Sequence, residues 1–183
     1  AAIVGWYHFD EAPTGTASTA ETVLVNSIDP TKGAGYCRVF KYNRSVYYNQ
    51  PTIDTAPAEL MPAYVDGVPE NIAFLDPLTG TMLFNRRALH CTSSDPTKLT
   101  SQDGSVVYLA DTELHQSQAF TVEFFLKVAT ETVDWSGLVY KFAGTSWSSK
   151  RQIFGVNLQG KKPVLTVKTS IGTYEAKGTS TIC

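Results

Sequence analysis

Three observations predict an all-β protein, a sandwich of two stacked antiparallel sheets. Apolar residues occupy every second position between 120 and 128, as they do in a strand with one buried face. Several shorter alternating segments follow one another with turn residues between them, which is typical of sandwiches and barrels. The composition is rich in Thr, Ser, Gly, Tyr and Val, a set that includes strong strand formers. The apolar positions of the long segment are Phe120, Val122, Phe124, Leu126 and Val128.

Length and charge narrow the class of protein. A chain of 183 residues suits a single domain, 1–183, that buries roughly 70% of its unfolded surface. The formal net charge of −2 and the lack of a long basic run argue against nucleic acid as a partner. No apolar run approaches the roughly 20 residues that a membrane span needs. The start at Ala1 fits either a mature product after signal cleavage or an excised piece.

Short strands are predicted in order along the chain, each an alternating or apolar run that ends at turn residues. One short helical turn, 111–116, is expected between them, with Asp111 or Thr112 as its cap. The last three strands should form a meander, because only short polar turns separate them. The predicted strands are 3–9, 22–25, 36–40, 81–84, 88–91, 105–110, 119–128, 137–142, 152–158, 164–169 and 173–177.

A long proline-rich insertion, at about 41–80, is expected to wrap the surface as an ordered loop. Five prolines exclude a regular helix or a central strand there. Tyr64, Ile72 and Phe74 are apolar anchors that argue against disorder. The prolines are Pro51, Pro57, Pro62, Pro69 and Pro77.

Four segments, in order along the chain, resemble the laminin-G-like, concanavalin A-like jelly-roll family. The resemblance covers about two thirds of the chain and implies a jelly-roll sandwich. Residues 62–69 and Asn85 are similar to a long insertion of bacterial cell-surface members, which implies an extracellular or cell-surface location. The four segments are 4–11 (VGWYHFDE), 87–91 with 104–109 (RALHC and GSVVYL), 120–127 (FTVEFFLK) and 136–141 (SGLVYK).

The chain departs from that family after the meander. The family continues with a strand bearing Trp-His-His, a hairpin with Asp-Gly and a closing strand with Asp-Glu, and none of these follows residue 177. Strand 3–9 would then lack its neighbour and expose unpaired backbone groups. Three explanations stay open: a truncated sandwich, missing strands supplied by another chain through β-augmentation, or a rearranged self-sufficient fold.

Three cysteines leave at least one without a partner inside the chain. A bridge between Cys37 and Cys91 would close a loop of about 55 residues, worth roughly 4 kcal/mol in the chain-entropy model. The alternative is three free thiols. Cys183, the last residue, either pairs with another chain or marks where the chain was cut.

No catalytic constellation is found, and the chain is expected not to be an enzyme. The carboxylate pairs Glu131 with Asp134 and Asp111 with Glu113 lack the spacing that glycanases of this fold use, and solvated loop charges explain them. The three histidines have no second ligand at metal spacing, so surface or sheet-face roles are expected. They are His8, His90 and His115.

No cofactor is expected to be required, and calcium is the one cofactor for which the sequence offers candidate ligands. The resemblance implies a calcium site at the sandwich rim, where Asn26 and Asp29 would each give one oxygen. The alternative for both residues is an Asx-turn. Asn43 begins an Asn-Arg-Ser triplet that matches the N-glycosylation pattern.

Two functions follow from these features. The first is a non-catalytic extracellular structural or adhesive module that assembles with other protein chains or with copies of itself by strand complementation. The second is a carbohydrate-binding module for cell-surface glycans, in which loop aromatics stack on sugar rings. Its candidate ligand-binding residues are Trp147, Trp135, Tyr47 and Tyr48, for which core packing is the alternative.

Overall fold

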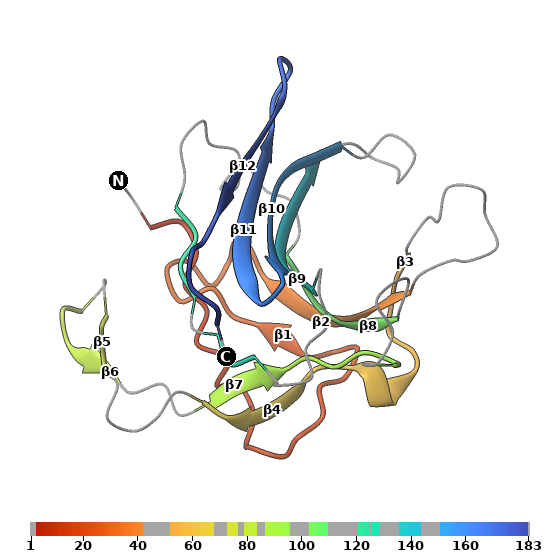
Figure 1. Ribbon diagram of the computed structural model, residues 1–183. Coiled ribbons are helices and arrows are strands. Elements are labelled where there is room, and N and C mark those ends of the chain that lie inside the picture. The colour runs from red at the N-terminus through yellow and green to blue at the C-terminus, as the bar shows by residue number, and fades with distance from the viewer. Residues whose placement is uncertain are drawn as a thin grey trace. The chain divides into compact units, whose positions relative to one another are not determined.

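The computed structural model confirms an all-β fold. It describes residues 3–41, 52–67, 73–76, 79–83, 87–95, 103–109, 121–124, 126–128, 136–143 and 151–182. Within these ranges every regular element is a strand in an antiparallel sheet, apart from one 3-10 turn, η1 (Ala58–Leu60). The strands belong to two four-stranded and two two-stranded sheets (Figure 1).

The chain divides into two compact units. The first comprises Ala1–Lys41, Ile53–Ser94 and Asp103–Phe125, and the second comprises the remaining residues up to Cys183. Each unit is described by itself, and the prediction of a single domain over 1–183 stays a prediction.

The first unit is organised around strand β2, whose residues alternate between buried and half-buried. Three other strands pair with β2, and β8 does so along six consecutive residue pairs. Alternation puts Cys37 and Val39 on the buried face, because side chains of a strand point to opposite sides in turn. The strands of this sheet are β1 (Val23–Leu24), β2 (Gly35–Lys41), β3 (Thr52–Asp54) and β8 (Gly104–Leu109).

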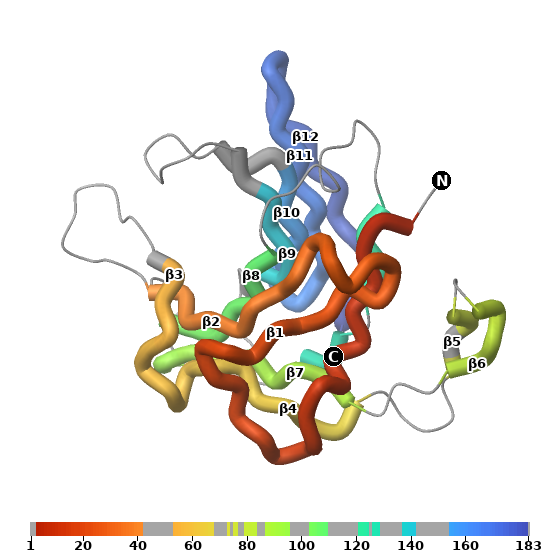
Figure 2. The backbone as a smooth tube through the Cα atoms, turned by 180° about the vertical axis from the view of Figure 1, so that it is seen from behind, coloured from red at the N-terminus to blue at the C-terminus, as the bar shows by residue number. Residues whose placement is uncertain are grey.

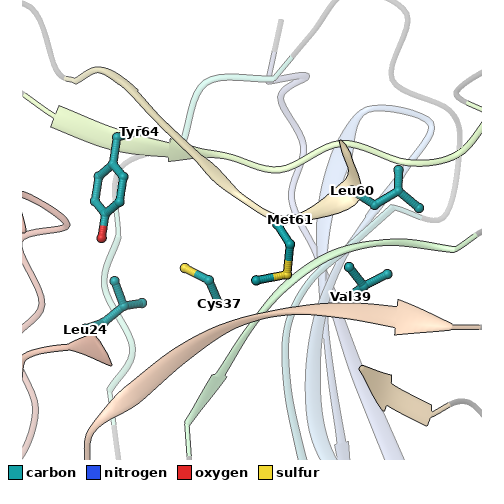
Figure 3. Packing of buried hydrophobic residues seen from close by; sticks show 6 residues of the cluster. All are labelled: Leu24, Cys37, Val39, Leu60, Met61 and Tyr64. Carbon is teal, nitrogen blue, oxygen red and sulfur yellow. The ribbon is translucent and has the colours of Figure 1, made fainter. Parts of the chain in front are cut away.

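A second layer of the first unit packs against this sheet. Tyr64 on β4 (Ala63–Asp66) points toward Cys37 (Figure 3), and Leu89 on its partner β7 (Arg87–His90) packs against the same cluster. Two small sheets therefore share one apolar core, which is how paired sheets bury their inner faces. The buried members of the core are Leu24, Cys37, Val39, Leu60, Met61 and Tyr64.

The second unit is a regular meander. Its four strands pair in the order β12-β11-β10-β9, so each strand lies beside the next one along the chain (Figure 1). The turn at 169–172 is the tip of the β11–β12 hairpin, which extends past β9 and β10 in both views (Figures 1 and 2). The strands are β9 (Ser136–Ala143), β10 (Arg151–Gln159), β11 (Lys162–Lys168) and β12 (Thr173–Lys177).

Most predicted strands are confirmed with bounds within a residue or two, and 173–177 is confirmed with the same bounds. The all-β, antiparallel part of the predicted fold is established, and the jelly-roll sandwich stays a prediction. The predicted helical turn at 111–116 lies outside the described residues.

Two predicted strands are wrong for the residues that the structure describes. Residues 3–9 have no strand pairing, and the same holds for 121–124 and 126–128. Val122, Phe124 and Leu126 are 44%, 45% and 38% exposed, so the expected buried face does not form. Alternation fixes which side chains share a face, but a strand also needs a neighbour to receive its backbone hydrogen bonds. Phe120 lies outside the described residues.

The proline-rich segment contains more regular structure than predicted. It forms β3, η1, β4 and the short hairpin of β5 (Phe74–Leu75) with β6 (Met82–Leu83). Tyr64 is only 1% exposed and anchors the segment as expected. Ile72 lies outside the described residues.

Candidate interaction surface

The outer strand of the second unit, β12, is the most accessible regular edge in the described structure. All five of its residues are exposed, although each pairs with a residue of β11. On its other side no described strand pairs with it. An open edge of this kind presents a row of N–H and C=O groups to another chain.

The hydrogen-bond pattern shows which backbone groups of β12 face outward. Gly178 N–H donates to Pro163 C=O at 2.7 Å, and Thr169 N–H donates to Gly172 C=O at 2.8 Å. In an antiparallel ladder, hydrogen-bonded pairs alternate with non-hydrogen-bonded pairs. Since the pairs at both ends of this ladder are hydrogen-bonded, Tyr174 and Ala176 also form hydrogen-bonded pairs with β11. The remaining residues of the strand direct their N–H and C=O groups away from β11; these are Thr173, Glu175 and Lys177.

One face of the same hairpin is apolar and partly exposed. Leu165 pairs with Ala176 and Val167 pairs with Tyr174, so all four side chains share one side of the sheet. Leu165 is 40% exposed and Tyr174 is 54% exposed, while Ile171 at the hairpin tip is 84% exposed. Apolar side chains beside an open edge are typical of surfaces that bind other proteins.

Two of the other outer strands are blunted. β1 has only two residues, and beyond them the Val25 N–H donates to Glu11 Oε1 at 2.9 Å. β9 pairs with β10 through two register irregularities, and bulges disfavour further strand pairing. The β11–β12 ladder is regular over its five pairs, as is the β2–β8 ladder over six, but four of the six β8 residues are half-buried. The exposure of all five residues therefore distinguishes β12 from β8, β4 and β7.

The sequence predicted β12 as a strand but not as an edge. A signal was present in its charges, because Glu175 and Lys177 lie two residues apart on the side opposite Tyr174. Natural sheets place such charged side chains on edge strands. Lys177 Nζ also donates to Gln159 Oε1 at 3.0 Å.

A groove of about 400 Å³ with both polar and apolar lining residues lies in the first unit. Glu59 and Asp103 contribute carboxylates, while Thr92, Ser93 and Ser94 contribute hydroxyl groups. Pro57 and Leu60 supply its apolar wall. Acceptors and hydroxyls in this combination suit a ligand with many hydroxyl groups.

Asn26, a candidate calcium ligand, is saturated by the protein. Its Oδ1 accepts hydrogen bonds from the N–H groups of Trp6 and Ile28, both at 3.1 Å. Its Nδ2 donates to Val4 C=O at 3.1 Å and to Lys32 C=O at 3.2 Å. The side chain is buried, and its amide bonds backbone groups of the N-terminal segment, which has no strand partner among the described residues.

Asp29, the other calcium candidate, forms the Asx-turn named as its alternative. Its Oδ1 accepts from the N–H of Thr31 at 3.0 Å and from the Thr31 hydroxyl at 2.6 Å. These bonds, with Lys32 nearby, hold the pKa of Asp29 below its usual range. Among the described residues no group of three metal-ligating side chains occurs, and calcium binding stays a prediction.

Cys37 and Cys91 are free thiols in the structure, so the predicted bridge between them is not formed there. Cys37 is buried in the core and Cys91 is exposed. Burial raises the pKa of the Cys37 thiol, which keeps it protonated and unreactive at neutral pH.

Tyr64 links the core to a carboxylate. Its hydroxyl donates to Glu11 Oε2 at 3.3 Å, which satisfies the polar end of an otherwise buried side chain. Burial first, and the neighbouring charge of Glu11 second, raise the pKa of Tyr64 well above its ordinary value.

The remaining predicted site residues fall into two groups. His8 accepts a hydrogen bond from the Trp6 indole, and His90 is exposed at the end of β7. The aromatic, glycosylation and carboxylate candidates lie outside the described residues, as does His115. They are Trp147, Trp135, Tyr47, Tyr48, Asn43, Asp111, Glu113, Glu131, Asp134 and Cys183.

Comparisons with protein-family models, with curated proteins and with solved structures found no match to this chain. Within the described ranges, no helix has the length and apolar character that crossing a membrane would require.

Proposed function

We propose that this chain is a non-catalytic interaction module that assembles with other protein chains through the β12 edge. The observation that supports it is the outward row of backbone groups on Thr173, Glu175 and Lys177, in a strand whose residues are all exposed. Main-chain hydrogen bonds supply affinity when a strand is added to such an edge, and adjacent side chains supply specificity. Leu165 and Tyr174 lie beside the edge and add apolar area to the interface.

An extracellular or cell-surface structural or adhesive role belongs to the same proposal. It draws on the resemblance of four sequence segments to laminin-G-like domains. Assembly through sheet edges suits such a role, because one continuous sheet then spans neighbouring chains.

Replacing Glu175 by proline tests the edge itself. The Glu175 N–H faces away from β11, so a proline there removes an outward donor without removing a bond of the β11–β12 ladder. Sedimentation velocity over a range of protein concentrations should show association of the unmodified chain and much weaker association of E175P. E175A removes the same side chain but keeps the outward N–H, so its association should fall by less than that of E175P. Association that survives E175P unchanged would exclude this edge.

A carbohydrate-binding role is a second candidate, and the groove of the first unit favours it. Glu59 and Asp103 line this groove, and carboxylates accept hydrogen bonds from hydroxyl groups. Binding on a glycan array that E59Q weakens would support this role, and Trp147→Ala tests the loop aromatics in the same way. A blank array at high protein concentration would count against it.

A further inference from the structure

We infer that two copies of this chain pair antiparallel through their β12 strands in one register, centred on Ala176. The inference rests on the proposed function and names both the partner, a second copy, and the alignment. Identical edges that meet around a twofold axis must run antiparallel, with each residue facing its counterpart across the centre. The choice of register is then a matter of which backbone groups and which charges face each other.

The backbone restricts the register first. Hydrogen-bonded pairs must form between residues whose N–H and C=O groups both point outward, which in β12 are Thr173, Glu175 and Lys177. Centring on Ala176 puts Glu175 of each copy opposite Lys177 of the other. Each of these two pairs can exchange both of its N–H···O bonds, and the Ala176 residues form the close non-hydrogen-bonded pair between them.

The charges select among the registers that the backbone permits. With Ala176 at the centre, each Glu175 carboxylate lies across the strands from a Lys177 ammonium on the same face, a favourable cross-strand pair. With Glu175 at the centre, like carboxylates would lie directly opposite each other, which is destabilising. With Tyr174 at the centre, Glu175 would face Thr173 and no ion pair would form.

The side chains on the other face agree with the same register. Tyr174 would lie opposite Gly178, whose side-chain position is covered by the Pro163 ring of its own chain, so the aromatic ring would pack beside that proline. Both apolar faces would also lie on one side of the joined sheet, since the twofold axis runs perpendicular to it. Leu165 and Tyr174 of the two copies would then line a single continuous apolar face.

Charge reversal tests the register with its own internal control. E175K places a lysine opposite Lys177, and K177E places a glutamate opposite Glu175, so each variant alone should dissociate with a dissociation constant raised about tenfold or more. An equimolar mixture of the two variants should associate, because opposite charges then meet at both pairs. The double variant E175K/K177E should associate for the same reason. E21K, a charge reversal at an exposed residue of the first unit, is the matched control and should behave as the unmodified chain.

A cysteine at the centre tests the alignment directly. Paired Ala176 residues would place their Cα atoms about 4.5 Å apart, within the range of about 4.4–6.8 Å that a disulfide needs. In a background with Cys91→Ser and Cys183→Ser, A176C should form a disulfide-linked dimer under mild oxidation with oxidised glutathione, and E175C should not.

The outcomes separate the two proposals. Association that ignores the charge reversals, or that crosslinks through E175C rather than A176C, overturns the register while leaving assembly through β12 in place. A chain that is monomeric at every concentration overturns both. Recovery in the mixture of single variants, together with the A176C crosslink, supports the register, and circular dichroism of each variant confirms that it is folded.

Discussion

Replacing Asn26 by alanine should destabilise the protein more than its single side chain suggests. Asn26 is 1% exposed, and its amide makes four hydrogen bonds that tie the segment around Trp6 to the turn after β1. Each bond to a buried polar group contributes about 1 kcal/mol, and the backbone groups left behind lose their partner. The expected loss is therefore about 3–4 kcal/mol in the free energy of unfolding.

Urea unfolding followed by tryptophan fluorescence suits this measurement, because Trp6 donates its backbone N–H to the Asn26 side chain. Asn157→Ala is the matched control. Asn157 is also buried, at 9% exposure, but its side chain accepts one hydrogen bond, from the Tyr140 hydroxyl, and a smaller loss of about 1–2 kcal/mol is expected. Asn26→Asp should also destabilise, since its oxygens would face the carbonyls of Val4 and Lys32. A loss below about 1 kcal/mol for N26A would refute the reasoning.

Three further predictions follow from the first unit. Burial raises the pKa of Tyr64 in the folded protein, whereas its pKa in the unfolded chain is about 10. The free energy of unfolding should therefore be constant below about pH 10 and fall by about 1.4 kcal/mol per pH unit above it. Tyr64→Phe should flatten this fall in urea titrations, and an unchanged slope would contradict the assignment. Gly67→Ala should cost about 2 kcal/mol or more, because a Cβ there would lie 2.5 Å from the backbone N and O of Arg87. Gly172→Ala meets only ordinary contacts at 3.8 Å and should be nearly neutral, and equal thermal midpoints for the two variants would refute the contact argument. Calcium chloride and EDTA should leave the thermal midpoint unchanged, because the Asn26 amide is already saturated by protein groups. A thermal midpoint that rises with calcium, and no longer rises in Asp29→Ala, would support the predicted calcium site.

The sequence predicted the meander well because each of its strands borders the next. Strand 173–177 follows a short polar turn and pairs with the strand just before it, so local pattern and tertiary pairing coincide. Residues 3–9 alternate as convincingly but are held by the Asn26 side chain instead of a strand. Residues 121–124 and 126–128 also alternate, but in the described structure they have neither a strand partner nor a side chain that takes its place. Periodicity reports which side chains share a face, and only the fold reports whether a neighbour exists.

Only part of the candidate interaction surface could be predicted from the sequence. The strand and its charges could be predicted, yet its position at the edge depends on the order of all four strands in the sheet. The Asx-turn at Asp29 was foreseen as an alternative because Asp, Pro and Thr form such turns locally. The hydrogen bonds of Asn26 join residues far apart in the sequence, and no local sequence pattern predicts them.

Amide hydrogen exchange at the β12 edge tests the central claim most directly. The N–H groups of Thr173, Glu175 and Lys177 face away from β11, whereas those of Tyr174 and Ala176 face toward it. Resolved by NMR at low and high protein concentration, exchange at the three outward amides should slow as concentration rises, while exchange at Tyr174 and Ala176 stays slow throughout. Outward amides that exchange at the same rate at every concentration would contradict assembly through this edge.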